Sequence, residues 1–108
     1  MSMAGDGNTP NPDDATGTTV LRRQLVICNK RGLHARAAAK FVTLAERFGA
    51  SVEVEKGGQS VSARSIMGLM MLGAGLGATI TLSAEGWDAK EAMDALAALV
   101  EAGFHEQD

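Results

Sequence analysis

The chain has few of the residues that mark disulfide-rich, membrane or nucleic-acid-binding proteins. Its 108 residues include one cysteine, two prolines, one tryptophan and no tyrosine. The single cysteine, Cys28, excludes an internal disulfide and is compatible with a reducing compartment. No apolar run reaches the roughly 18 residues of a membrane span, and the N-terminus lacks the basic and apolar regions of a secretory signal. We therefore expect a cytoplasmic protein that does not insert into a membrane.

The charge balance and composition favour one soluble globular domain. The formal net charge is −3, and no basic cluster with interleaved aromatic residues suggests a nucleic acid as partner. With 45 % hydrophobic residues, the chain can build a modest core. We divide it into a disordered N-terminal extension over residues 1–19, a folded domain over residues 20–103, and a short acidic tail over residues 104–108.

The hydrophobic periodicity predicts an α+β domain in the order β-α-β-β-α-β-α. Alternating apolar residues indicate four strands, over residues 20–28, 51–55, 59–62 and 78–84, with Gly57-Gly58 as a hairpin turn. Apolar residues at helical spacing indicate helices that run from His34 to a stop at Gly49, over residues 66–72, and from Asp88 to a stop at Gly103. Asp88 followed by Glu91 has the pattern of a capping box. A four-stranded sheet with helices on one face buries these apolar faces.

One histidine stands at the start of the first predicted helix. The run reads Lys30-Arg31-Gly32-Leu33-His34-Ala35-Arg36, so a glycine turn precedes His34 and a permanent cation follows it. The free backbone N–H groups of a helix start attract phosphate, and an arginine suits phosphoryl oxygens. The pattern is typical of a site that carries phosphate on an imidazole nitrogen. A capping or solvated surface histidine would give the same local pattern.

Ser65 precedes a second, unusually apolar helix. A serine at this position is a good N-cap, which is a purely structural role. The helix carries more apolar side chains than one buried face can hold, so some of them should be exposed as a binding surface. We expect Met67 and Gly68 at the exposed rim and Leu69 or Leu72 in the core. The glycine-rich stretch that follows lacks the spacing of a nucleotide-binding loop and reads as a turn.

The run Gly32-Leu33-His34-Ala35-Arg36-Ala37-Ala38 resembles the active-site signature of the HPr family, the histidine-containing phosphocarriers of the bacterial phosphotransferase system. The similarity continues through residues 65–73 and 83–86 and covers roughly residues 21–103. The resemblance implies an open-faced β-sandwich, with an antiparallel sheet in strand order 1-4-2-3 and three helices on one face.

The resemblance also implies roles for particular residues. His34 would accept a phosphoryl group on Nδ1 from a phosphohistidine of enzyme I, formed from phosphoenolpyruvate, and pass it to an EIIA-type acceptor protein. Arg36 would stabilise the phosphoryl charge, with the backbone N–H groups of Ala35 and Arg36 holding its oxygens. Ser65 matches a regulatory phosphorylation site that HPr kinase/phosphorylase uses in some bacteria. The partner surface would include Ile66, Met67, Gly68 and Met70.

The sequence departs from the family pattern at Ala37, where many members have proline. Proline in the first turn of a helix pre-sets φ and lacks an N–H that has no helical partner there, so alanine keeps the helix and adds one donor. Together with the Gly-Phe-acidic ending, this residue favours the nitrogen-related branch of the phosphotransferase system, in which the acceptor is a regulatory protein.

Other classes of function stay open. The domain could be a regulatory binding module that acts through the Ser65 helix, a small-molecule sensor, or an independent enzyme that lacks a second catalytic group near His34 in sequence. Cys28, His34 and His105 are too far apart in sequence to suggest a metal site, and no cofactor is expected. A carrier that exposes one face should be a monomer.

Overall fold

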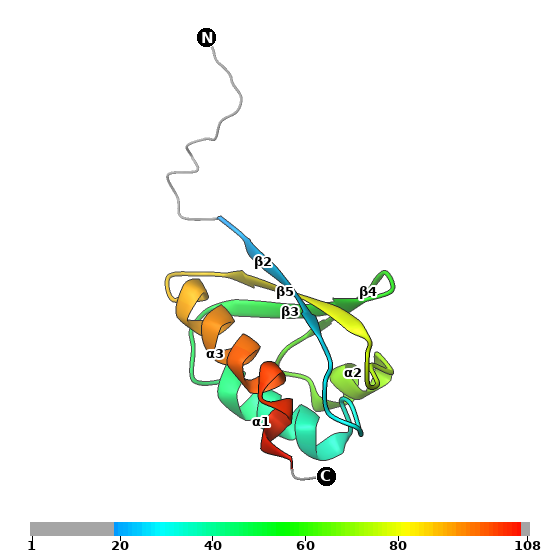
Figure 1. The fold of residues 1–108 in the computed structure, drawn as a ribbon. Coiled ribbons are helices and arrows are strands. Elements are labelled where there is room, and N and C mark those ends of the chain that lie inside the picture. The colour runs from blue at the N-terminus through cyan, green and yellow to red at the C-terminus, as the bar shows by residue number, and fades with distance from the viewer. Residues whose placement is uncertain (1–18, 107–108) are drawn as a thin grey trace.

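The computed structural model describes residues 19–106, which form a single sheet covered by helices on one face (Figure 1). The strands are β2 (Leu21–Val26), β3 (Ser51–Lys56), β4 (Gln59–Ser62) and β5 (Thr79–Glu85), and the helices are α1 (Ala35–Ala45), α2 (Ile66–Met71) and α3 (Ala89–Glu101). A short turn, η1 (Gly103–His105), follows α3. The N-terminal extension predicted over residues 1–19 lies outside the described residues except for Thr19, as do the last two residues of the predicted tail.

The sheet is antiparallel throughout, with the order β2-β5-β3-β4. In chain order among the described strands this is first, fourth, second and third, which confirms the predicted topology. The predicted hairpin is also confirmed. Gly57 and Gly58 have φ values of 58° and 86°, so they form the two-residue turn between β3 and β4 that requires left-handed backbone at both positions.

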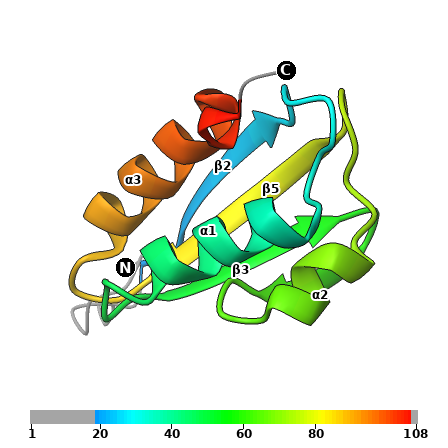
Figure 2. The ribbon, with the colours of Figure 1, turned by 90° about the horizontal axis from the view of Figure 1, so that it is seen from below.

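The core lies between the sheet and the helices, which all cover the same face (Figure 2). Leu25 pairs with Ile80, and Val54 with Leu82, so each inward position of one strand meets an inward position of the next. Most of the apolar residues predicted to face the core from α1 and α3 are buried against these strands. They comprise Ala38, Phe41, Val42 and Ala45 on α1, and Ala89, Ala92, Met93, Leu96, Leu99 and Val100 on α3. Phe48, also predicted for the first helix, is half-buried and lies beyond it, because α1 ends at Ala45 and does not reach the predicted stop at Gly49.

Arg23 interrupts the apolar face of β2, and its guanidinium forms an ion pair with α3. Its guanidinium donates a hydrogen bond to Asp94 of α3 at 3.1 Å, on the exposed side of the helix. Lys90 binds the same carboxylate at 2.8 Å. Lys90 and then Arg23 hold the pKa of Asp94 below its ordinary value of 3.8. The arginine therefore reaches solvent at the edge of the sheet and leaves the core apolar.

The capping box predicted at Asp88 was wrong. Asp88 is the residue before α3, but its side chain makes no capping hydrogen bond to that helix. Its carboxylate is buried and accepts hydrogen bonds from the backbone N–H groups of Gly49 at 2.9 Å and Ala50 at 2.8 Å. Asp88 makes this tertiary contact in place of the helix cap because the turn between α1 and β3 presents two backbone N–H groups. Without the carboxylate, these N–H groups would lose their hydrogen bonds on burial.

Candidate functional site

The turn that carries His34 packs tightly against the segment after α2. Gly32 has a φ of 62°, and a side chain there would overlap the carbonyl oxygen of Ala74 and lie 2.7 Å from the Cα atom of Gly75. The next residue, Leu33, is buried and donates its N–H to the Ala74 carbonyl at 2.9 Å. Glycine is therefore required at position 32, and the glycine-rich stretch is the support of this turn.

His34 lies at the open start of α1. It is the N-cap residue and has extended backbone, and its side chain does not cap the helix. The first hydrogen bond of the helix runs from the Ala38 N–H to the His34 carbonyl at 2.8 Å. The N–H groups of Ala35, Arg36 and Ala37 lie before it, at the end of a helix where backbone donors have no helical acceptor. No acidic side chain lies in the first turn, and Arg36 is exposed. The predicted helix start is confirmed, and it offers an anion both backbone donors and a cation.

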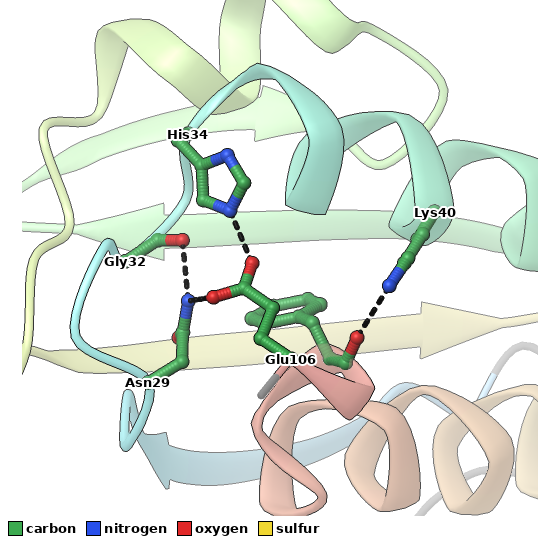
Figure 3. Close-up of polar contacts among 6 residues, drawn as sticks. Asn29, Gly32, His34, Lys40 and Glu106 are labelled. Atoms are coloured by element: carbon green, nitrogen blue, oxygen red, sulfur yellow. Dashed lines mark hydrogen bonds and ion pairs between the residues drawn. The ribbon is translucent and has the colours of Figure 1, made fainter. Parts of the chain in front are cut away.

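The structure adds Glu106 to this site, from the far end of the chain (Figure 3). One carboxylate oxygen of Glu106 contacts Nε2 of His34, and the other accepts a hydrogen bond from Nδ2 of Asn29 at 3.0 Å. Nδ2 of Asn29 also donates to the Gly32 carbonyl at 2.9 Å. The second ring nitrogen of His34, Nδ1, lies on the side of the ring away from Glu106 (Figure 3). Among residues 19–106, Glu106 is the side chain that holds the imidazole, and it does so at Nε2.

This cluster is largely covered. The His34 side chain is 16 % exposed, the Glu106 side chain 11 %, and Asn29 is buried. Hydrogen bonds from His34 and then Asn29, with the positive charge of Arg31, hold the pKa of the Glu106 carboxyl below its ordinary value of 4.5. His34 is therefore more enclosed than a freely exposed carrier histidine, because Glu106 lies against one edge of its ring.

A left-handed turn brings Glu106 to His34. Gly103, Phe104 and His105 have φ values of 63°, 57° and 58°, a conformation that non-glycine residues seldom adopt. The Phe104 ring is fully buried, and the Phe104 carbonyl accepts a hydrogen bond from the Lys40 ammonium group at 2.6 Å. We call residues 103–106 the C-terminal hook. The strained backbone persists because the buried ring and the Lys40 contact hold it.

Sequence reasoning missed Glu106, Asn29 and Lys40. Glu106 is 72 residues from His34, and the hook depends on left-handed backbone at residues whose side chains disfavour it. Gly103, placed just after a helix, was the one local signal that the chain turns there.

The structure confirms the cap at Ser65 and the exposed position of Met67, but the exposed position predicted for Gly68 was wrong, because Gly68 packs against Ser65 and Val61. The Ser65 hydroxyl accepts a hydrogen bond from the Gly68 N–H at 2.9 Å, which confirms the cap. Leu69 and Leu72 are both buried. The helix leaves four large apolar side chains exposed, Ile66, Met67, Met70 and Met71, whereas Gly68 is half-buried. Because α2 packs beside α1, this apolar surface flanks the helix that His34 begins (Figure 2).

An open groove of about 480 Å³ runs along the other side of α1. Its floor is apolar, with Ala39 and Leu44 of α1 facing Leu99 of α3. Three cationic side chains line it: Arg36 and Lys40 of α1, and Arg47 in the turn that follows the helix. The cationic face of α1 is therefore continuous with the start of the helix, where His34 and Arg36 lie.

Between residues 19 and 106, no three His, Cys, Asp or Glu side chains lie together as a metal-binding group. In the same range, no helix has both the length and the apolar character needed to cross a bilayer.

A four-stranded open-faced sandwich with a histidine at the start of its first helix is the arrangement of a class of small phosphoryl-carrying proteins. Residues 21–102 match the family described as the HPr component phosphorylation site of the phosphotransferase system. The chain belongs to this family, the HPr phosphocarriers, which relay phosphoryl groups within that system.

Similar proteins come from several bacteria. Phosphocarrier protein NPr of Shewanella violacea is 52 % identical over 82 % of this chain and 97 % of its own length. Phosphocarrier protein HPr of Cupriavidus necator is also 52 % identical, over 81 % of this chain and 98 % of its own. The crystal structure of HPr-C-His from Thermoanaerobacter tengcongensis superimposes with a TM-score of 0.78 at 46 % identity, covering 82 % of this chain and 99 % of that one.

Proposed function

We propose that His34 is the residue on which this phosphocarrier holds its phosphoryl group, accepting it from enzyme I and passing it to an EIIA-type acceptor protein. The observation that carries the proposal is the position of His34 at the open start of α1, with Nδ1 directed away from Glu106. The backbone N–H groups of Ala35 and Arg36 lie at the same helix end, where partial positive charge favours phosphate.

The transfer needs no other reactant. The lone pair on His34 Nδ1 forms a bond to phosphorus while the bond from phosphorus to the donor's imidazole nitrogen breaks, and its electron pair returns to that nitrogen. The acceptor step is the reverse reaction with a second protein. Because one N–P bond replaces another, the transfer is close to balanced. Arg36, exposed two residues after His34, stabilises the charge on the phosphoryl oxygens during each step.

The proposed partner surface consists of Ile66, Met67, Gly68 and Met70 on α2, together with α1. Met67 is 69 % exposed, although water does not favour exposure of so large an apolar side chain. Flexible methionines suit a surface that must fit both a donor and an acceptor.

Ser65, at the start of this helix, is the proposed regulatory phosphorylation site, and HPr kinase/phosphorylase is the class of enzyme that would use it. A phosphate there would place negative charge within the docking surface.

The proposed branch is the nitrogen-related one, with a regulatory EIIA-type protein as acceptor. Ala37 and the Gly-Phe-acidic ending support it. Overall similarity does not separate the branches, because the NPr and HPr relatives are equally identical to this chain. The proposal places the carrier in the cytoplasm, where phosphoenolpyruvate is available. Competition between a nitrogen-type and a sugar-type EIIA for the phosphorylated carrier tests the branch, and faster transfer to the sugar-type protein would reject it.

The test of the carrier function is incubation with enzyme I and phosphoenolpyruvate, followed by phosphorus NMR. We expect a phosphoimidazole signal, labile to acid and stable to alkali, in the wild type and its absence in His34→Ala. The chain has one other histidine, His105, so His105→Gln is the matched control and should keep the signal. A signal that persists in His34→Ala would assign the chemistry to another residue.

The second candidate function is a binding module that acts through α2. The exposure of Met67 and Met71, at 69 % and 74 %, is the observation that favours it. A wild type that takes up no phosphate from enzyme I, yet binds a partner in a manner that Met67→Ser abolishes, would support this function against the carrier.

A further inference from the structure

We propose that Glu106 is a positioning residue that fixes the tautomer of His34, so that Nε2 carries the proton and Nδ1 keeps the lone pair that attacks phosphorus. This inference rests on the proposed carrier function and deepens it. It assigns a role in the reaction to the C-terminal hook, which lies outside the segment that carries the His34 motif.

The hydrogen-bonding capacity of the cluster determines where the proton lies. An ionised carboxylate only accepts hydrogen bonds, so Nε2 of His34 must donate to Glu106 and must carry the proton. In a neutral imidazole the other nitrogen then has the free lone pair, and Nδ1 lies on the side of the ring away from Glu106 (Figure 3). The nitrogen that needs to be nucleophilic is therefore the one that the contact leaves free.

The carboxylate is itself held on its other side. Asn29 is buried, and its Nδ2 atom donates both to Glu106 and to the Gly32 carbonyl. Both partners are acceptors, so the amide must present its NH₂ group to them, and this orientation is fixed. Asn29 thus links the carboxylate to the turn that carries His34, and the ring and its partner keep their relative positions.

The hook has the features of a segment held in place for this contact. Three successive residues, Gly103 to His105, have positive φ, and two of them are not glycine. Phe104 is fully buried and its carbonyl accepts a hydrogen bond from Lys40 of α1, the helix that His34 begins. Strained backbone held by surrounding contacts is characteristic of functional sites. Here the strain directs Glu106 back onto the imidazole.

The same contact serves the phosphorylated state. When Nδ1 forms its bond to phosphorus, Nε2 keeps its proton and the ring becomes cationic at the moment of attack. The Glu106 carboxylate lies beside that developing charge, and no proton has to leave the site. When the acceptor takes the phosphoryl group, the electron pair returns to Nδ1 and the original tautomer is restored.

Glu106→Gln provides the test, because Asn29 determines how the new amide lies. Nδ2 of Asn29 still requires an acceptor, so it takes the glutamine oxygen and the glutamine NH₂ group faces Nε2 of His34. Nε2 must then accept, and the proton moves to Nδ1. We expect nitrogen NMR of the unphosphorylated variant to show the Nδ1–H tautomer, against Nε2–H in the wild type. Loss of a charge-assisted hydrogen bond predicts that transfer from enzyme I slows by about 10- to 100-fold.

Two further variants complete the design. Glu101→Gln removes the same charge from the exposed end of α3 and should change neither the tautomer nor the rate. Glu106→Asp keeps an acceptor-only group and should keep the Nε2–H tautomer, with a rate between those of the wild type and the glutamine variant. A Glu106→Gln protein that retains both the Nε2–H tautomer and the wild-type rate would overturn the inference. A wild type that takes up no phosphate would instead reject the carrier function, since the tautomer is read before any transfer.

Discussion

Replacement of Gly32 by alanine tests whether the turn before His34 is held by close packing or only by its unusual backbone angle. Gly32 has a φ of 62°, and an alanine Cβ would overlap the Ala74 carbonyl oxygen. Gly57, in the β3–β4 hairpin, has nearly the same φ of 58°, but no atom of residues 19–106 outside its chain neighbours lies within 4 Å of its Cβ position. Alanine at either position must adopt left-handed backbone, but only at Gly32 would its Cβ also overlap a neighbouring atom.

The shared cost is the left-handed conformation, about 1–2 kcal/mol for a residue with a side chain. Alanine also restricts the unfolded chain, and this effect is the same at both positions. At Gly32 the backbone must also move away from Ala74, which adds about 1–3 kcal/mol for overpacking. The displacement weakens the hydrogen bond from the Leu33 N–H to the Ala74 carbonyl. We expect Gly32→Ala to lower the free energy of unfolding by about 2–5 kcal/mol, and Gly57→Ala by about 1–2 kcal/mol.

Urea unfolding of the two variants at the same pH measures this difference, and phosphoryl transfer from enzyme I adds a second measurement. Gly32→Ala moves the turn that carries His34, so transfer should slow, whereas Gly57→Ala should transfer at the wild-type rate. Equal destabilisation by the two substitutions would refute the packing argument. It would mean that the segment after α2 moves away from the new Cβ atom with no loss in the free energy of unfolding.

Two other predictions concern Glu106 and Ser65. The folded-state pKa of Glu106 is depressed, so its contribution to stability is present above its ordinary value of 4.5 and is lost as the pH falls through the folded-state pKa. Urea unfolding between about pH 3 and pH 7 should therefore show a steeper loss of stability in the wild type than in Glu106→Gln, and parallel curves would contradict this linkage. Ser65→Ala removes the hydrogen bond to Gly68 and should lower the free energy of unfolding by about 1 kcal/mol, whereas Ser65→Asn, which can still cap, should lower it less.

Local patterns in the sequence were sufficient to predict the order of elements and the faces that they bury. On β3 and β5, the buried residues Val54, Ile80 and Leu82 alternate with polar neighbours. Burial of an alternating strand on one face determines its register. The strand order came from the family resemblance, because periodicity alone does not say which strands are neighbours. Asp88 was misassigned because a capping pattern is local, whereas the donors that Asp88 found belong to Gly49 and Ala50, 39 and 38 residues away.

The site was predictable where a motif lies in one stretch of chain. His34 and Arg36 share a helix start, and Ser65 is a cap next to Gly68. Glu106 was not predictable by this route. Its contact with His34 depends on a positive φ at Phe104 and His105, which their side chains disfavour and which only the buried ring and the Lys40 contact explain. The roles of His34, Arg36 and Ser65 in phosphoryl transfer and its regulation remain predictions, and the phosphorus NMR experiment tests that of His34.

Within residues 19–106 the helices all cover one face of the sheet, and the opposite face offers a place to attach a label. Gln24 is exposed on β2 next to the buried Leu25, and successive side chains of a strand point to opposite faces, so Gln24 points away from the helices that carry the proposed docking surface. A tether or fluorophore attached there would fix the carrier to a support, or report its motion, while leaving both helices accessible. Cys28 is also an exposed thiol, so thiol coupling at a new cysteine would first require its replacement. A carrier immobilised in this way would show whether transfer depends on free diffusion between donor and acceptor.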